Sequence, residues 1–133
     1  MLSTKEITFD QSWKIIAFGN ILSGTLPTEL GNLQAASHLM LAFNELTGTI
    51  PTEIGLLTSL SRLDLPFNSM VGTIPSELGN LSSMTKFHGQ ENLFNGTVPT
   101  EICENAPSNG GVLGVFIMDC LEELSCGCCS FCL

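Results

Sequence analysis

Six cysteines are the side chains of this sequence best suited to covalent or metal chemistry, and all lie in its last quarter. They are Cys103, Cys120, Cys126, Cys128, Cys129 and Cys132. An even, clustered set of cysteines is typical of disulfides formed in an oxidising compartment. We therefore expect a disulfide-stapled cap, whose pairing the sequence leaves open.

A zinc site is an alternative interpretation of the four terminal cysteines, Cys126, Cys128, Cys129 and Cys132. Zinc sites favour Cys-x2-Cys pairs separated by a longer loop, and only Cys129 and Cys132 have that spacing. Palmitoylation of the cluster is a third interpretation. The spacing favours the cap over a metal or thiol site, and we predict no metal site.

Motifs of enzymatic catalysis are absent from the sequence. It contains no P-loop, no His-Glu-x-x-His zinc motif and no nucleophile elbow. Both histidines, His38 and His88, precede the cysteines and are separated from them along the chain. We therefore predict that the chain is not an enzyme, has no catalytic residues and uses no cofactor.

The basic side chains are few and regularly spaced. Four basic residues stand against 13 acidic ones, giving a net charge of -9, which argues against nucleic acid as a partner. Lys14, His38, Arg62 and Lys86 follow one another at intervals of 24 residues. If they stack at about 5 Å, their repulsion is relieved by an anionic partner, such as an acidic peptide or an anionic glycan. The alternative is a solvated, variable column that Asp64 partly neutralises.

The same 24-residue period governs the whole middle of the chain. The motif Asn-x-x-x-Gly-Thr-x-Pro occurs four times without insertion or deletion. Its asparagines are Asn20, Asn44, Asn68 and Asn92. A repeat this short cannot close its own core and must stack on its neighbours, so the sequence predicts a solenoid.

Each repeat contains a short strand. Leu63 and Leu65 alternate with polar residues, which predicts a strand with two side chains in the core. The equivalent pairs are Ile15 and Ala17, Leu39 and Leu41, and Phe87 and Gly89. Stacked repeats place these strands side by side in a parallel sheet.

The residues after each strand predict a turn and a short helix. We expect the asparagine amide to be buried and to bond the backbone of its own turn and of the next repeat. Thr28, Thr52, Ser76 and Thr100 follow the prolines and suit the N-cap of a helical turn. Glu29, Glu53, Glu77 and Glu101 then lie in its first turn, where the helix dipole favours negative charge.

The exposed strand positions form columns on the opposite, concave face. Beside the basic column we expect Ile16, Met40, Asp64 and His88, and toward the turn Phe18, Phe43 and Phe67, then Gln90 and Glu91. We predict that these columns bind the ligand. The glutamates form a solvated row on the convex side.

The pattern Leu-x-x-Leu-x-Leu-x-x-Asn-x-Leu-x-Gly-x-Ile-Pro resembles the plant-type leucine-rich repeat. This class is found in receptor-like kinase ectodomains and polygalacturonase inhibitors. The resemblance implies an α/β fold, a right-handed solenoid with a short parallel concave sheet and short helical or 3-10 turns on the convex side. It also implies binding of proteins, peptides or glycans, without catalysis in the repeats.

The resemblance divides the chain into three parts. Residues 12–102 hold the four repeats, and residues 103–133 form the Cys-rich C-terminal cap. Residues 1–11 are a degenerate half-repeat or a truncated N-terminal end, with residues 2–9 as a convex half-repeat. The paired-cysteine N-terminal cap usual in the family is absent, so we expect apolar surface at that end.

Other departures concern the last repeat and the cap. Gly89 replaces a core leucine, and we expect a void or a weakened strand there. Residues 105–111 predict a loop, residues 112–118 the last strand of the sheet, and residues 119–124 a short turn.

We therefore hypothesise a recognition module on the concave sheet, within a larger secreted or cell-surface receptor-like protein. The sequence shows no signal peptide and no transmembrane segment, so we expect a longer precursor and an extracellular or cell-surface location. Asn80 and Asn95 lie in glycosylation sequons. The alternative function is a structural or adhesive extracellular spacer without one specific ligand.

Overall fold

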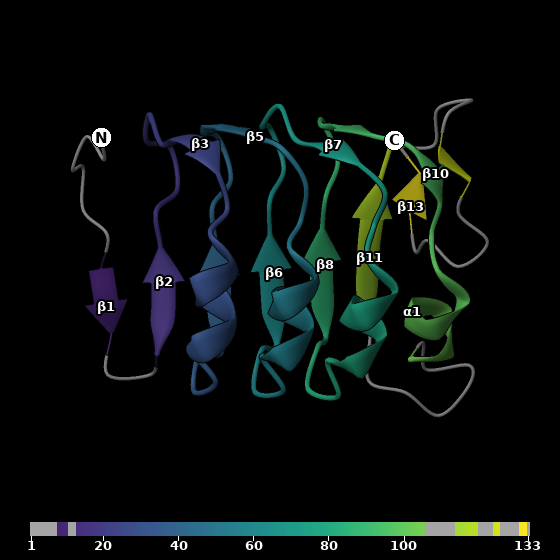
Figure 1. Cartoon of the computed structure of the whole chain (residues 1–133), viewed down its shortest axis with the longest axis horizontal. Coiled ribbons are helices and arrows are strands. Elements are labelled where there is room, and N and C mark those ends of the chain that lie inside the picture. The colour runs from purple at the N-terminus through teal and green to yellow at the C-terminus, as the bar shows by residue number, and fades with distance from the viewer. Residues whose placement is uncertain (1–7, 11–12, 106–113, 120–123, 126–130, 133) are drawn as a thin grey trace.

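A stack of short strands forms one wall of the molecule in the computed structural model, which describes residues 8–10, 13–105, 114–119, 124–125 and 131–132. Its seven described strands lie in the order β1-β2-β4-β6-β8-β11-β13 (Figure 1). They are β1 (Thr8–Asp10), β2 (Lys14–Ile16), β4 (His38–Met40), β6 (Arg62–Asp64), β8 (Lys86–His88), β11 (Val115–Met118) and β13 (Phe131–Cys132). From β2 to β13 every pairing is parallel, as the repeat predicts.

Short helices cover the other side of this sheet (Figure 1). Three 3-10 turns, η1 (Thr28–Asn32), η2 (Thr52–Leu56) and η3 (Ser76–Asn80), are followed by a one-turn α-helix, α1 (Thr100–Glu104). Among the described residues, no helix has the length and apolar character that crossing a bilayer requires.

Strands of two or three residues connect the concave sheet to the helical turns along one edge of the molecule. β3 (Ser23–Thr25) pairs with β5 (Glu45–Thr47), β7 (Val71–Gly72) with β9 (Leu93–Phe94), and β10 (Gly96–Thr97) with β12 (Leu124–Ser125). The result is the leucine-rich-repeat solenoid that the sequence predicts, with a parallel sheet on one side and short helical turns on the other.

The hydrophobic core lies between the sheet and the helical turns. Leu39, Leu63 and Phe87, the inward residue of three successive strands, are at most 1% exposed. Ile54 and Leu78 close the core from the helical side. Because each strand contributes the same inward positions, the residues between them face outward in columns.

The asparagines form a hydrogen-bonded ladder, but in the direction opposite to our expectation. Nδ2 of Asn44 donates to the carbonyl oxygens of Leu41 in its own turn and Ala17 in the preceding repeat, at 3.0 and 2.7 Å. Its Oδ1 accepts from the Leu22 N–H of the preceding repeat at 3.1 Å. Asn68 and Asn92 repeat this pattern. The prediction of partners in the next repeat was therefore wrong.

Asn20, the first member of the ladder, has no such support among the described residues. Its Nδ2 makes one long bond to the Phe18 carbonyl oxygen, at 3.5 Å. Its Oδ1 is buried without a hydrogen-bond partner in the described part of the chain. The hydrogen bonding of the ladder is therefore extensive at Asn44, Asn68 and Asn92 and weak at Asn20.

The helical turns begin one residue earlier than predicted. Pro27, Pro51, Pro75 and Pro99 are the N-cap residues, and none makes a side-chain capping bond. The hydroxyl of Thr52 instead donates to the carboxylate of Glu53 at 3.3 Å, and the other three repeats show the same contact. The N-cap role predicted for the threonines was wrong, whereas the glutamates do lie in the first turn.

Gly89 leaves no void in the last repeat. A Cβ atom added to Gly89 would lie 2.5 Å from the sulfur of Met118, which comes from β11 and is fully buried. The Gly89 N–H also donates to the Ile117 carbonyl oxygen at 2.9 Å. The expected void was wrong because a side chain from outside the repeats fills the space.

The ends of the sheet also differ from expectation. β1 pairs antiparallel with β2, so Thr8 and Phe9 extend the sheet instead of forming a convex half-repeat. β11 pairs with β8 as predicted, but it is not the last strand, because β13 pairs with its outer side. Leu124, expected at the end of a turn, begins β12. The remaining residues of 1–11 and 103–133 lie largely outside the described part of the chain.

Candidate ligand-binding face

The predicted basic column is in register across four neighbouring strands. Lys14 pairs with His38, His38 with Arg62, and Arg62 with Lys86, each as a backbone register partner on the next strand. The second column, Ile16, Met40, Asp64 and His88, is in register in the same way. Lys86 is exposed, and most of the other members are half-buried. The structure therefore brings together both columns that the sequence predicts.

A buried carboxylate lies within these columns. Asp64 is 4% exposed, and its Oδ2 lies 2.6 Å from Nε of Arg62 on the same strand. Its Oδ1 lies 2.8 Å from Nδ1 of His88, but the geometry is not that of a hydrogen bond. This second contact is an ion pair only when the imidazole is protonated. Asp64 thus fixes one edge of the Arg62 guanidinium and neutralises part of the column.

The guanidinium of Arg62 keeps binding capacity after this contact. Its Nε is used by Asp64, and a guanidinium carries further N–H donors on its two Nη atoms. Those donors suit the two oxygens of a carboxylate. A side chain held at one edge also loses less conformational entropy when it binds a second anion.

His38 lies between the two other cations of its column. Burial lowers the pKa of its imidazole below the ordinary value of 6.5, and the charges of Lys14 and Arg62 lower it further. The carboxylate of Asp64 and the hydrogen bond with Ser37 act in the opposite direction and are smaller. His38 is therefore mostly neutral at pH 7, and the column is less positive there than its composition suggests.

Three phenylalanines form an aromatic ladder where the concave strands end. The ring centroids of Phe43 and Phe67 are 4.2 Å apart at an interplanar angle of 16°, and those of Phe18 and Phe43 are 5.1 Å apart at 59°. Phe18 precedes the repeat position of the other two by one residue, because Gly19 occupies that position in the first repeat. All three rings are exposed. The sequence placed them near each other but did not predict the stacking.

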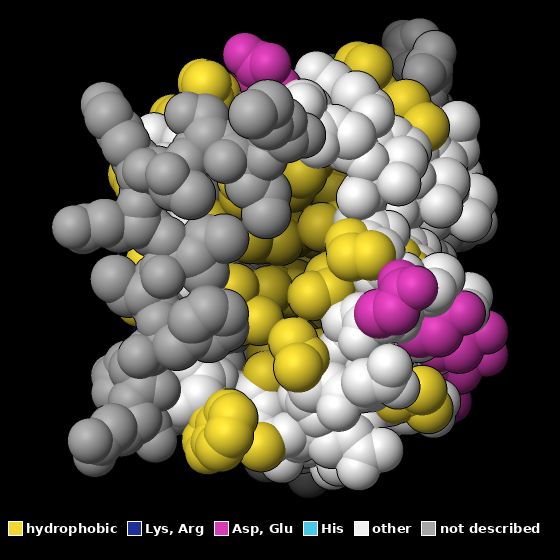
Figure 2. All heavy atoms as spheres, turned by 60° about the vertical axis from the view of Figure 1, so that its left-hand side comes forward, with side chains coloured by type: hydrophobic (Ala, Val, Ile, Leu, Met, Phe, Trp, Pro, Cys, Tyr) yellow, Lys and Arg dark blue, Asp and Glu magenta, His cyan; other side chains and the backbone are white. Residues whose placement is uncertain are grey.

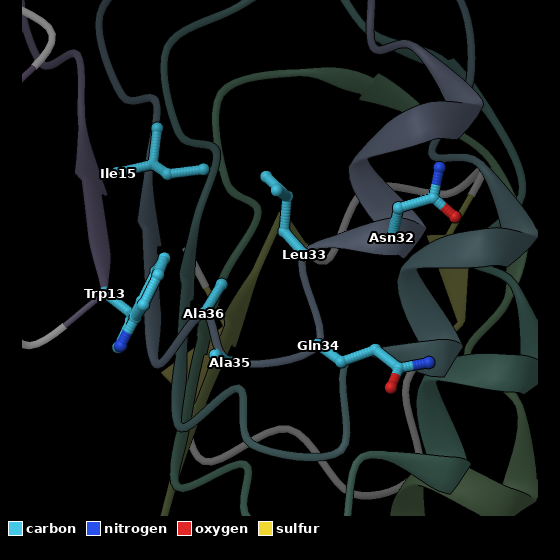
Figure 3. Close-up of a pocket in the computed structure, with 7 residues that line it drawn as sticks. All are labelled: Trp13, Ile15, Asn32, Leu33, Gln34, Ala35 and Ala36. Atoms are coloured by element: carbon cyan, nitrogen blue, oxygen red, sulfur yellow. The ribbon is translucent and has the colours of Figure 1, made fainter.

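An apolar pocket lies at the N-terminal end of the solenoid, and the sequence did not predict which residues form it. It has a volume of about 330 Å³ and is lined by Trp13, Ile15, Asn32, Leu33, Gln34, Ala35 and Ala36. Figure 2 shows the hydrophobic floor of a hollow on this side of the molecule, and Figure 3 shows Ile15 of β2 facing Leu33, which follows η1. Within the described residues the pocket adjoins the first repeat of the core, and the apolar surface expected at that end was its only signal in the sequence.

The remaining candidates lie apart from the concave face. Cys103, half-buried at the end of α1, takes part in a disulfide. Cys120, Cys126, Cys128 and Cys129 lie outside the described residues, so the pairing of the cap stays a prediction. The sequon residues Asn80 and Asn95 are both exposed. No group of ligating side chains suited to a metal occurs among the described residues.

Comparison with known proteins gives one matching family model and many similar structures. The model described as Leucine Rich Repeat matches residues 59–81, which span the third repeat. A search of curated protein sequences gave no match.

Three solved structures illustrate the likeness. The PEPR1–AtPEP1 complex is 40% identical over 69% of this chain, with a TM-score of 0.68. The plant peptide hormone receptor RGFR1 in complex with RGF2 is 33% identical over 86%, with a TM-score of 0.70. The Arabidopsis receptor kinase HAESA, in complex with the peptide hormone IDA and the co-receptor SERK1, is 29% identical over 84%, with a TM-score of 0.70.

This chain spans only 13%, 16% and 18% of those three chains. The likeness therefore concerns a stack of repeats and not a whole receptor. This likeness agrees with the four repeats of the sequence and with the observed solenoid. This chain is a leucine-rich-repeat protein of the plant type.

Proposed function

We propose that this chain is a non-catalytic recognition module that binds an acidic ligand on its concave sheet. The ligand is a peptide, a protein segment or an anionic glycan. The observation that carries the proposal is the registered column of Lys14, His38, Arg62 and Lys86 in a protein of net charge -9. Basic groups gathered on one face attract anions locally even when the whole molecule is acidic.

The convex side supports this assignment by contrast. Glu29, Glu53, Glu77 and Glu101 lie in the first turns of the convex helices, so that side repels anions. An acidic ligand is thus directed to one face. The similar receptor structures in complex with peptide hormones add support for a peptide or protein ligand.

The test is charge reversal with two anionic probes, hexaglutamate and trigalacturonate, at low ionic strength. Replacing Lys14, Arg62 and Lys86 together by glutamate is expected to abolish binding of both probes. Leu56→Glu adds negative charge to the exposed convex side and serves as the control, with near-normal binding expected. Circular dichroism verifies that each variant is folded. Unchanged binding by the folded triple variant contradicts the proposal.

An extracellular or cell-surface location within a larger receptor-like protein is part of the same proposal. Exposed Asn80 and Asn95 then carry glycans, and the terminal cysteines form a disulfide cap. Secretion from a eukaryotic host followed by glycosidase treatment is expected to lower the apparent mass. Full-length product without any mass change contradicts glycosylation at both sites.

A structural or adhesive spacer is the second candidate, and the apolar N-terminal pocket favours it. Exposed apolar surface at the end of a solenoid promotes end-to-end association. This function predicts self-association that rises with protein concentration and is weakened by Trp13→Ser, without affinity for either anionic probe. Sedimentation velocity at several concentrations measures it, and a monomer at all concentrations contradicts it.

A further inference from the structure

The aromatic ladder of Phe18, Phe43 and Phe67 is not needed by the fold. The side chains are 57%, 46% and 43% exposed, so they contribute little to the core. Single exposed apolar residues are common on protein surfaces, but a contiguous aromatic stack is not. Its presence on the same face as the basic column needs another explanation.

The backbone under the ladder strengthens this point. Phe43 and Phe67 have φ angles of 57° and 56°, in the left-handed region that bulky side chains disfavour. Gly19 has the same conformation, with a φ of 67°, at the equivalent position of the first repeat. Each of these residues donates its N–H to a carbonyl of the next repeat, at 3.0 to 3.2 Å. The turn therefore forms equally well without an aromatic side chain.

The stacking decides what the ladder can recognise. A sugar ring binds best on the open face of an aromatic ring, but Phe43 and Phe67 cover each other's inner faces at a centroid distance of 4.2 Å. Between these two rings only the edges are accessible, and ring edges pack well against aromatic and aliphatic side chains. This arrangement favours a peptide over a glycan.

We infer that the ligand of the concave face is a peptide segment with two anchors, one acidic and one apolar. The acidic side chain binds beside Arg62 and Lys86, and an aromatic or large aliphatic side chain packs on the ladder. This inference rests on the proposed function, because it needs an acidic ligand on the same face. It adds the chemical class of that ligand and its second contact.

The length of the strands sets the spacing between the anchors. Arg62 begins β6, which ends at Asp64, and Phe67 comes three residues later in the turn, so the two subsites are five residues apart along the chain. A strand rises about 3.3 Å per residue, which separates the subsites by roughly 15 Å. An extended ligand spans this distance in about four residues, and side chains four apart lie on the same face.

A pair of synthetic peptides tests the inference. The apolar probe is N-acetyl-Glu-Glu-Ser-Ser-Phe-amide, and the matched probe ends in alanine instead of phenylalanine. NMR titration of the full chain is expected to show about five-fold tighter binding of the apolar probe. Phe43→Asn with Phe67→Asn is expected to remove this preference, so that the double variant binds the two probes with equal affinity. Asparagine tolerates the left-handed conformation, so the turn is kept.

Leu56→Asn is the matched control, because it removes an exposed apolar side chain from the convex side. It is expected to keep the preference for the apolar probe. Equal binding of the two peptides by the wild-type chain overturns the two-anchor ligand and leaves the proposed function standing.

Two further outcomes separate the alternatives. Trigalacturonate that binds tighter than either peptide, and that weakens on Phe43→Asn, overturns the peptide assignment in favour of a glycan. Failure of every acidic probe to bind overturns the proposed function together with this inference.

Discussion

Nε of Arg62 lies 2.6 Å from Oδ2 of Asp64, so a cation of the concave face is held by a buried carboxylate on the same strand. This pair has two opposing effects on an incoming anion. It orders the guanidinium, which favours binding, and it places a negative charge near the ligand, which opposes binding. Because the Arg62 side chain is still partly exposed, the gain from ordering it is small, and we expect the repulsion to dominate.

Removal of this carboxylate is therefore expected to tighten binding. Asp64→Asn keeps the shape of the side chain but not its charge, and we predict about three-fold tighter binding of hexaglutamate at low ionic strength. Arg62→Gln is the companion variant, for which weaker binding is expected. Isothermal titration calorimetry measures both. Weaker binding by Asp64→Asn would show that ordering of Arg62 matters more than repulsion.

His38 predicts a pH dependence of stability. Its folded-state pKa is below its unfolded value of 6.5, so the unfolded chain binds more protons at this site as the pH falls below 6.5. The contribution of His38 therefore lowers stability on acidification and vanishes above that pH. We expect His38→Gln to lose less stability than the wild type between pH 7 and pH 5.5, as measured by urea unfolding. An identical loss in both proteins would exclude this role.

The asparagine ladder predicts a position-dependent loss of stability. Asn44→Ala removes bonds to the turn and to the preceding repeat, leaving the Leu22 N–H without its acceptor, and is expected to cost about 2 to 4 kcal/mol. Asn20→Ala removes one long bond, the single bond that its side chain makes among the described residues, and is expected to cost under about 1 kcal/mol. Denaturant unfolding compares the two variants, and equal losses contradict the ladder as described.

The close contact between Gly89 and Met118 predicts a compensating pair. Gly89→Ala places a methyl group against the Met118 sulfur and is expected to destabilise the fold by about 1 to 3 kcal/mol. Met118→Ala alone leaves a cavity, but the double variant relieves the clash. The sum of the two single losses is thus expected to exceed the loss in the double variant. Additive losses in thermal unfolding would mean that the two sites are independent.

Much of the fold follows from the sequence because the period is constant. A 24-residue repeat without insertions places Arg62 beside His38 and Lys86 whatever the details of the turns. The same regularity fixes which residues of each strand are buried, and Leu39, Leu63 and Phe87 are buried as predicted.

Other features depend on contacts that the 24-residue period does not specify. The period is the same toward the preceding and the next repeat, so it did not show that Asn44 bonds the preceding one. Met118 fills the space at Gly89 from a strand outside the repeats, where no periodic signal exists. The stacking of Phe18 on Phe43 joins residues at different repeat positions, so an alignment of repeats separates them. The pairing of Asp64 with Arg62 depends on side-chain conformations that the pattern leaves open.

Location of the ligand on the protein is the most direct test of the central claim. Backbone amide shifts of the isotopically labelled chain are recorded while the peptide N-acetyl-Glu-Glu-Ser-Ser-Phe-amide is added. We predict that the largest shifts occur in β4, β6 and β8 and at Phe43 and Phe67, and that they disappear in the Lys14, Arg62 and Lys86 charge-reversal variant. Largest shifts at the convex turns η1 to η3 or around Trp13 and Leu33 would contradict a ligand-binding concave face.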